Sequence, residues 1–280
     1  MVKTKFYRRI FLRLTIVFFL FSGMCVGKAQ PLNFYLGARF DGLSNATVMI
    51  PDLWSVSQNQ AGIAWVPSPS VGLHFENKFA VPEYSLSAMS AVIPTGHGSI
   101  GTMLYYFGYS MYHDIRVGIA YGHSFSERFA AGIQLNYINT YIADSYGSFH
   151  SVVAEGGIMA IPVENLYLGV HVYNLTASKM SDPERDPLPV ILRMGMGYQF
   201  RQRLFVSIET EKDKSHKAVF KTGAEFNINE TFFLRTGYST NPGKPSFGFG
   251  FLFYNFRADI AMTLHPTLGF TPYFSLMYSF

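Results

Sequence analysis

The sequence predicts an all-β protein, a transmembrane antiparallel up-and-down β-barrel of about 14 strands. Composition is the first indication: aromatic residues make up 17% of the chain and charged residues only 14%, against about 25% charged in ordinary globular domains. Second, no stretch after residue 29 approaches the roughly 20 continuous apolar residues of a membrane helix. Third, segments that alternate between polar and apolar residues fill the chain from Ser70 to its last residue, Phe280.

Residues 1–29 are expected to be a signal peptide. Several Lys and Arg residues precede the apolar run Leu14–Phe21, and the small residues Gly27 and Ala29 follow it, which predicts cleavage after Ala29. The alternative is a signal anchor that remains as one transmembrane helix, but the apolar run is short for that purpose.

Removing this segment changes the charge and thiol content of the protein. Six of the 22 basic residues and none of the 18 acidic ones lie in residues 1–29, so the mature chain has a net charge of −2. The basic character of the whole chain is therefore no argument for nucleic-acid binding, and no nucleic-acid partner is expected. The single cysteine, Cys25, also lies there, which excludes disulfides, thiolate metal sites and a cysteine nucleophile from the mature protein.

The barrel is expected to occupy residues 70–280. Each candidate strand has about 10 residues, alternates in polarity and is bounded by turn residues. The segments are Ser70–Phe79, Pro82–Ile93, Gly98–Tyr109, His113–His123, Arg128–Tyr141, Phe149–Ile161, Leu166–Asn174, Val190–Phe200, Arg203–Glu211, His216–Asn227, Thr231–Thr240, Ser246–Tyr254, Phe256–His265 and Gly269–Phe280. The even-numbered connections are short and several odd-numbered ones are longer, above all Thr176–Pro189, as expected for periplasmic turns and outer loops.

The alternation also assigns a polar, inward-facing side to each strand. Charged residues on that side are Asp114, Arg116, Arg128, Glu155, Arg193, Glu209, Lys221, Glu225, Arg235, Arg257 and Asp259. Six are basic and five are acidic, whereas an ion-selective pore is lined mostly by one sign. We therefore expect a lumenal network of ion pairs, with Arg116, Glu155 and Arg235 among its members, and local pairs Arg193–Glu209 and Arg257–Asp259.

The last strand has one wholly apolar face, made by Phe274, Leu276, Tyr278 and Phe280. An edge strand of a soluble sheet with this face would be an aggregation hazard in water. The strand resembles the C-terminal signal of bacterial outer-membrane barrels. That resemblance implies the outer membrane of a Gram-negative bacterium as the location, with both mature termini in the periplasm, and outer-membrane lipid and the barrel-assembly machinery as partners.

Residues 30–69 do not read as a membrane strand. They carry two short motifs, and the matching residues are Gly37, Ala38, Arg39, Gly42 and Ala46 in the first and Asn59, Ala61, Gly62 and Ala64 in the second. This stretch resembles the N-terminal region of the FadL-like outer-membrane family, which includes PorV- and PorQ-type proteins of the type IX secretion system. Gln60 stands where the family has proline. The resemblance implies a 14-stranded barrel whose N-terminal segment folds inside the lumen as a hatch.

No enzyme, metal or cofactor site is expected. The eight His residues form no H-x-x-x-H or H-E-x-x-H pair, and nothing resembles G-x-S-x-G. The Tyr and Phe residues near strand ends are typical of an interfacial girdle.

Two functions from different classes follow from the resemblance. The first is a plugged barrel of the PorV/PorQ type, a component or partner in protein secretion or surface attachment that contacts secretion-system components or exported cargo. The alternative is FadL-like transport of hydrophobic small molecules, which requires an apolar cavity beside a break in a strand. Gly156-Gly157 is the candidate for such a break, although paired glycines are also explained by clearance for the hatch. An unplugged diffusion porin is disfavoured by the residues before Ser70.

Overall fold

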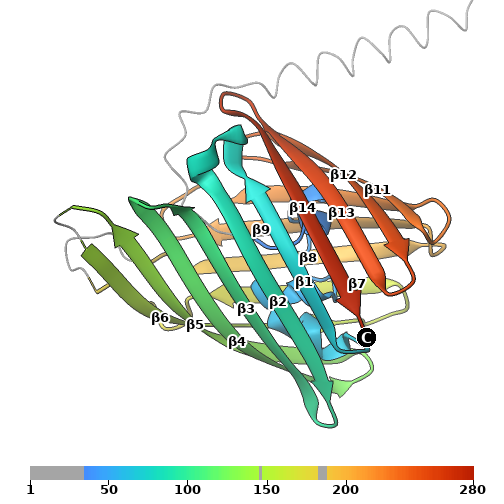
Figure 1. Cartoon of the computed structure of the whole chain (residues 1–280). Coiled ribbons are helices and arrows are strands. Elements are labelled where there is room, and N and C mark those ends of the chain that lie inside the picture. The colour runs from blue at the N-terminus through green and yellow to red at the C-terminus, as the bar shows by residue number, and fades with distance from the viewer. Residues whose placement is uncertain (1–34, 145–146, 182–187) are drawn as a thin grey trace, which may run out of the picture. The chain divides into compact units, whose positions relative to one another are not determined.

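A computed structural model describes residues 35–144, 147–181 and 188–280 of this protein (Figure 1). The expected signal peptide lies outside the described residues, as do residues 30–34 of the expected hatch and residues 182–187 of the loop Thr176–Pro189. The described residues form a closed antiparallel barrel in which each strand pairs with its neighbours in the sequence and β14 pairs with β1.

The barrel has the expected 14 strands, and each strand boundary lies within three residues of its prediction. The strands are β1 (Ser70–Asn77), β2 (Ser85–Thr95), β3 (Gly98–Tyr109), β4 (Tyr112–Ser126), β5 (Phe129–Ile142), β6 (Gly147–Ala160), β7 (Leu166–Tyr173), β8 (Ile191–Phe200), β9 (Leu204–Asp213), β10 (Val219–Asn227), β11 (Phe232–Ser239), β12 (Lys244–Phe253), β13 (Phe256–His265) and β14 (Gly269–Ser279). The predicted fold class, a 14-stranded antiparallel up-and-down barrel, is confirmed.

At the connection between β1 and β2 the predicted boundaries differ from the observed ones by two and three residues. Two 3₁₀ turns, η3 (Lys78–Ala80) and η4 (Pro82–Tyr84), replace the expected strand ends. Phe79 and Ala80 have φ values of 57° and 56°, which turn the chain out of the extended conformation. Pro82, which has no backbone N–H, lies in this turn, where no ladder hydrogen bond requires one.

Alternation along the strands separates an apolar outer face from a polar inner one. In β8, Leu192, Met194 and Met196 are exposed on the outside, whereas Arg193 is 3% exposed on the inside. Ile119 and Ile133, each 65% exposed, belong to the same outer surface. A band of this kind is typical of barrels whose outer face contacts lipid.

Residues 35–69, here called the lumenal segment, cross the interior of the barrel. The segment contains α2 (Ala38–Gly42), η1 (Leu53–Ser57) and η2 (Gln60–Trp65). Elements on opposite sides of the wall contact it: α2 packs against β11–β14, η1 against β1–β3 and η2 against β3–β6. Figure 1 shows these short helices (blue) enclosed by the strands. Among the described residues, no helix has the length and apolar character needed to cross a membrane.

Local sequence explains the two 3₁₀ helices. Asp52 and Ser55 form a capping box at the start of η1, in which each side chain bonds the other's backbone N–H. The Asn59 side chain accepts from the N–H of Ala61 at the start of η2. These caps satisfy backbone donors that water cannot reach inside the barrel.

The main apolar core of the protein lies inside the barrel. Its buried members in the lumenal segment are Leu36, Phe40, Leu43, Val48, Met49, Ile50, Leu53, Trp54, Val56, Ile63 and Val66. Inward-facing residues of β2 and β3, such as Leu86 and Met103, complete it. The lumenal segment is therefore packed as a protein core is packed, and does not lie loosely in a water-filled pore.

Candidate functional site

One group of charged side chains, here called the Arg39 cluster, joins the lumenal segment to the wall. Its members are Arg39, Asp52, Glu225, Arg235, Arg257 and Asp259. Arg39 donates to Glu225 from Nε at 3.0 Å and from a terminal nitrogen at 2.7 Å, and its other terminal nitrogen lies 2.6 Å from Asp52. Three guanidinium groups therefore face three carboxylates, and the cluster is neutral as a whole.

Glu225 is the centre of this cluster. Its Oε2 accepts from Nε of Arg235 at 2.6 Å, and a terminal nitrogen of Arg257 lies 3.7 Å from it. Asp259 lies 2.8 Å from Arg235 and 3.2 Å from Arg257. The expected pair Arg257–Asp259 is thus present, as one contact within a larger network.

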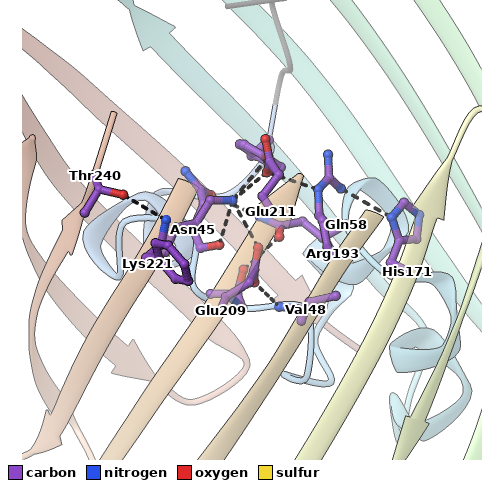
Figure 2. A network of polar contacts seen from close by, with 12 residues as sticks. Asn45, Val48, Gln58, His171, Arg193, Glu209, Glu211, Lys221 and Thr240 are labelled. Atoms are coloured by element: carbon purple, nitrogen blue, oxygen red, sulfur yellow. Dashed lines mark hydrogen bonds and ion pairs between the residues drawn. The ribbon is translucent and has the colours of Figure 1, made fainter. Parts of the chain in front are cut away.

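A second group, here called the Glu209 cluster, is made by Tyr35, Arg193, Glu209, Glu211 and Lys221 (Figure 2). Glu209 accepts the backbone N–H groups of Thr47 at 2.8 Å and Val48 at 2.9 Å. A wall carboxylate therefore satisfies two buried amides of the lumenal segment.

Lys221 and Tyr35 connect the members of the Glu209 cluster. The Lys221 ammonium lies 3.0 Å from Glu209 and 2.7 Å from Glu211. The Arg193 guanidinium and the Lys221 ammonium each lie 4.7 Å from the centre of the Tyr35 ring, and the Tyr35 hydroxyl donates to Glu211. The first described residue of the chain is thereby held against β8, β9 and β10.

Two expectations about the inward-facing charges are wrong. Arg193 pairs with Glu211 at 3.3 Å and not with Glu209, because the β8–β9 register places it directly opposite Glu211. Arg128 does not face the lumen: it is exposed in the turn between β4 and β5.

Glu155 and Arg116 lie in other parts of the lumen. Glu155 accepts from Asn136 at 2.5 Å and lies 3.2 Å from the His171 ring. Arg116 donates to the Tyr173 hydroxyl at 2.8 Å and lies over the rings of Tyr105 and Tyr173. The seven residues named as members of the expected ion-pair network thus divide among four places: the Arg39 cluster, the Glu209 cluster, the Glu155–His171 pair and Arg116.

Three contributors to these clusters were not singled out in the sequence: Tyr35, Asp52 and Glu211. Glu211 could have been found, because it alternates with Glu209 and therefore faces the same side of β9. Tyr35 and Asp52 carry no such pattern, since they lie outside the strands.

Several glycines line the wall where it meets the lumenal segment. A Cβ atom at Gly132 would lie 2.3 Å from the backbone carbon of Gln60, and one at Gly169 would lie 2.3 Å from the Val48 carbonyl oxygen. The lumenal segment is therefore held both by the charged clusters and by close packing against glycines of the wall, where a side chain would collide with it.

Six of the nine matching residues of the two N-terminal motifs lie in close contacts of the lumenal segment: Gly37, Ala38, Arg39, Asn59, Ala61 and Gly62. Gly37 has a φ of +100° and its N–H donates to His74 at 3.2 Å, and the N–H of Ala38 donates to Ser275 at 3.2 Å. Ala61 is fully buried, and a Cβ at Gly62 would lie 2.6 Å from the Ser55 hydroxyl. Arg39 anchors its cluster, as described above.

Asn59 has the most contacts of the six. Its amide donates to the carbonyl of Val48 at 2.7 Å, of Ile158 in β6 at 3.1 Å and of Val170 in β7 at 3.4 Å. A Cβ atom added at Gly157 would lie 2.3 Å from the side-chain oxygen of Asn59. Gly157 therefore provides clearance for the lumenal segment, which is the simpler of the two explanations considered for the glycine pair.

The junction between β6 and β7, here called the seam, is the weakest part of the wall. The ladder consists of five residue pairs and ends at Gly156 opposite Val172, whereas β5 and β6 pair along 14. Residues 147–155, which precede Gly156 in β6, have no ladder partner on β7 among the described residues. Two backbone hydrogen bonds from the β7–β8 connection replace it, Leu175 to Ala154 at 2.8 Å and Ser181 to His150 at 3.0 Å.

A small apolar cluster lies on the inner side of the seam. Its buried members are Ile138, Val153, Tyr173 and Ile191, with Leu188 packed against them. Gly156 faces outward, where a Cβ would touch the Leu175 side chain at 3.5 Å. The end of the β6–β7 ladder thus coincides with the glycine pair, although the register with β5 continues through it without interruption.

The C-terminal strand completes the outer surface. Phe274, Leu276 and Tyr278 lie opposite Phe75, Leu73 and Val71 of β1, and Phe274 is 46% exposed. Phe280 is 68% exposed at the end of the chain. These side chains form part of the apolar band.

No group of three or more His, Asp or Glu side chains is placed to bind a metal ion in the part of the chain that the structure describes.

Neither a protein-family model nor a curated protein sequence matches this chain. Its fold is similar to that of solved outer-membrane channels at low sequence identity. The toluene transporter TodX of Pseudomonas putida has a TM-score of 0.68 at 12% identity, covering 89% of this chain and 99% of that one. The toluene transporter TbuX of Ralstonia pickettii gives 0.64 at 12%, with 87% and 98% covered, and a FadL homologue of Pseudomonas aeruginosa gives 0.61 at 12%, with 91% and 100% covered.

Proposed function

We propose that this protein is an outer-membrane channel for hydrophobic small molecules, in which the lumenal segment closes the pore and the substrate leaves sideways through the seam. The apolar outer band supports the location. The likeness to channels named for toluene transport, and to a FadL homologue, supports the substrate class over the secretion-associated hypothesis.

The observation that carries the proposal is the short β6–β7 ladder. In lipid, each backbone N–H and C=O needs a protein partner, so a continuous ladder closes a barrel wall. At the seam, the described residues of the β7–β8 connection form two backbone hydrogen bonds with residues 147–155 of β6. Two more involve side chains: the His150 N–H donates to the Ser181 hydroxyl at 3.0 Å, and the Ser151 hydroxyl donates to the Lys179 carbonyl at 2.9 Å. Since a hydrogen bond stabilises by about 0.5–1.5 kcal/mol net, separating this stretch costs far less than separating β5 from β6.

The inner side of the seam suits the same role. The cluster of Ile138, Val153, Tyr173 and Ile191 offers an apolar surface between the lumen and the bilayer. A hydrophobic molecule that moves along this surface would reach lipid without crossing the Arg39 cluster, whose wall residues lie on β10, β11 and β13. Filling Gly157 does not test this path, because a side chain there collides with Asn59 first.

A reversible cross-link across the seam provides the test. Residues 30–280 contain no cysteine, so Cys at Ala154 and Leu175, whose backbones are hydrogen-bonded, form a single engineered pair within the barrel. The matched control places Cys at Leu104 and Val117, directly opposite each other on the outer face of the β3–β4 ladder. Uptake of radiolabelled toluene by cells that make each variant is measured before and after reduction.

Oxidation of the seam pair is expected to lower uptake to the level of cells without the protein, and reduction to restore it. The control pair is expected to transport in both states. Wild-type uptake no faster than in cells that lack the protein refutes the channel, and undiminished uptake with the seam locked refutes the lateral path.

A second candidate function is a plugged scaffold for protein secretion or surface attachment of the PorV/PorQ type. The observation that favours it is the firm, charge-balanced attachment of the lumenal segment through the Arg39 cluster. Affinity capture of the native protein in mild detergent separates the two: stoichiometric secretion components or exported proteins support the scaffold, and a lone barrel with a bound apolar molecule supports the channel.

A further inference from the structure

We infer that a pocket at the end of the barrel that carries the C-terminus binds small uncharged molecules with a single ring and one hydrogen-bonding substituent. The inference rests on the proposed function, because it names a class of molecule that the channel would carry. The pocket lies between the lumenal segment and the first residues of β7 and β9 and the last residues of β8, and its volume is about 160 Å³.

The size of the pocket limits the ligand. An apolar cavity of about 150 Å³ holds benzene, so 160 Å³ accommodates one six-membered ring with a small substituent. The pocket is separate from the unpaired part of the seam. The β6–β7 ladder ends at Val172, whereas the pocket contacts β7 near its first residue, at Tyr167.

The deep part of the pocket is apolar. Met49 is fully buried, Ile50 is 4% exposed and Phe205 is 8% exposed, and Pro51 completes this surface. Phe205 packs edge-on against Tyr167, with the ring centres 6.0 Å apart. Aromatic edges and a Met thioether are favourable contacts for the face and rim of a ring.

The rim of the pocket is polar but carries no free charge. The Arg39 guanidinium lies there, but it is already paired with both Asp52 and Glu225, and its cluster is neutral. The side chains of Tyr167 and Gln199 make no hydrogen bond to any other described residue. One hydroxyl and one carboxamide are therefore available to orient a substituent, and a carboxylate on the ligand finds no unpaired cation.

Binding of 4-fluorophenol, observed by ¹⁹F nuclear magnetic resonance, tests the inference. The mature full-length protein in lipid nanodiscs is titrated against the probe, with empty nanodiscs as the background. Gln199→Trp fills the pocket from its rim. Tyr198→Trp adds the same side chain one residue away, where Tyr198 faces outward at 40% exposure, and serves as the matched control.

We expect saturable binding to the wild type and to Tyr198→Trp, and no saturable binding to Gln199→Trp. Gln199→Leu and Tyr167→Phe, which keep the pocket's shape, are expected to weaken binding roughly two- to tenfold through the lost hydrogen bond. The charged analogue 4-fluorobenzoate is expected to bind at least tenfold more weakly. Binding that persists in Gln199→Trp, or 4-fluorobenzoate binding as tight as that of 4-fluorophenol, overturns the inference.

Transport is measured separately, which distinguishes the two failures. A wild type that carries toluene without binding 4-fluorophenol refutes the pocket and leaves the channel standing. Saturable binding that depends on Gln199, in a protein that carries nothing, refutes the channel and leaves the pocket as a site of another kind.

Discussion

Neutralising Glu225 is the sharpest test of how the lumenal segment is held. Glu225→Gln keeps the shape of the side chain and removes its charge. Three guanidinium groups would then share two carboxylates, Asp52 and Asp259. Arg235 has a fully buried side chain, and the side chain of Arg39 is 15% exposed, so water cannot replace the lost charge at both ends.

The expected cost is about 3 kcal/mol. Breaking a buried ion pair by removing one partner costs about 3–5 kcal/mol. The lower end applies here, because each of the three guanidinium groups keeps one carboxylate. A loss of about 3 kcal/mol changes the equilibrium between the bound and released segment by roughly 150-fold.

Tryptophan fluorescence measures this release directly. Both tryptophans of the chain, Trp54 and Trp65, lie in the lumenal segment, so their emission in a guanidinium titration reports the segment, while circular dichroism reports the strands. Glu83→Gln, a neutralisation at an exposed residue of η4, is the matched control. A fluorescence transition that moves by less than about 1 kcal/mol, the value of a surface ion pair, refutes the reasoning.

Two further predictions concern the same segment and the same assay. Burial raises the pKa of the Asp41 carboxyl well above its ordinary value, so the folded segment favours the protonated form. The stability of the bound segment therefore rises as the pH falls through that raised pKa toward the ordinary one. Asp41→Asn is expected to raise the fluorescence midpoint at pH 7 and to flatten its pH dependence between pH 5 and 8 (roughly the range tested), and an unchanged pH profile contradicts the assignment. Gly132→Ala places a methyl group 2.3 Å from the Gln60 backbone and is expected to destabilise the bound segment by about 1–3 kcal/mol. The control Gly96→Ala, whose added methyl group has no atom within 4 Å, is expected to have no effect. Equal effects of the two substitutions would refute the packing argument.

The wall could be predicted almost completely because its signals are local. β3 and β13 begin and end at their predicted residues, since polarity alternates along each strand and turn residues stand at both ends. The same alternation placed Arg193 and Glu209 on the inner face. It did not identify their partners: Glu209 and Glu211 both face inward two residues apart, and only the register with β8 decides that Arg193 meets Glu211.

The seam shows the same limit. Gly156-Gly157 was recognisable as a special place in β6, and paired glycines left two explanations open. The structure gives each residue its own surroundings: Gly157 faces Asn59 in the lumen, and Gly156 lies outward where the ladder ends. The side that a glycine faces depends on the register of its strand, and the end of a ladder depends on the neighbouring strand. Neither property can be seen in the glycine pair itself.

By itself, the sequence determined the number of strands, their limits and the two faces of the wall, because each of these follows from residues a few positions apart. Only the tertiary structure decided how residues 35–69 are held, because their partners are distant in the chain: Arg39 meets Glu225 across 186 positions, and Ala38 meets Ser275 across 237. The pocket between Met49, Tyr167 and Phe205 is of the same kind. Closing the barrel brings such residues together, and no local pattern records which ones will meet.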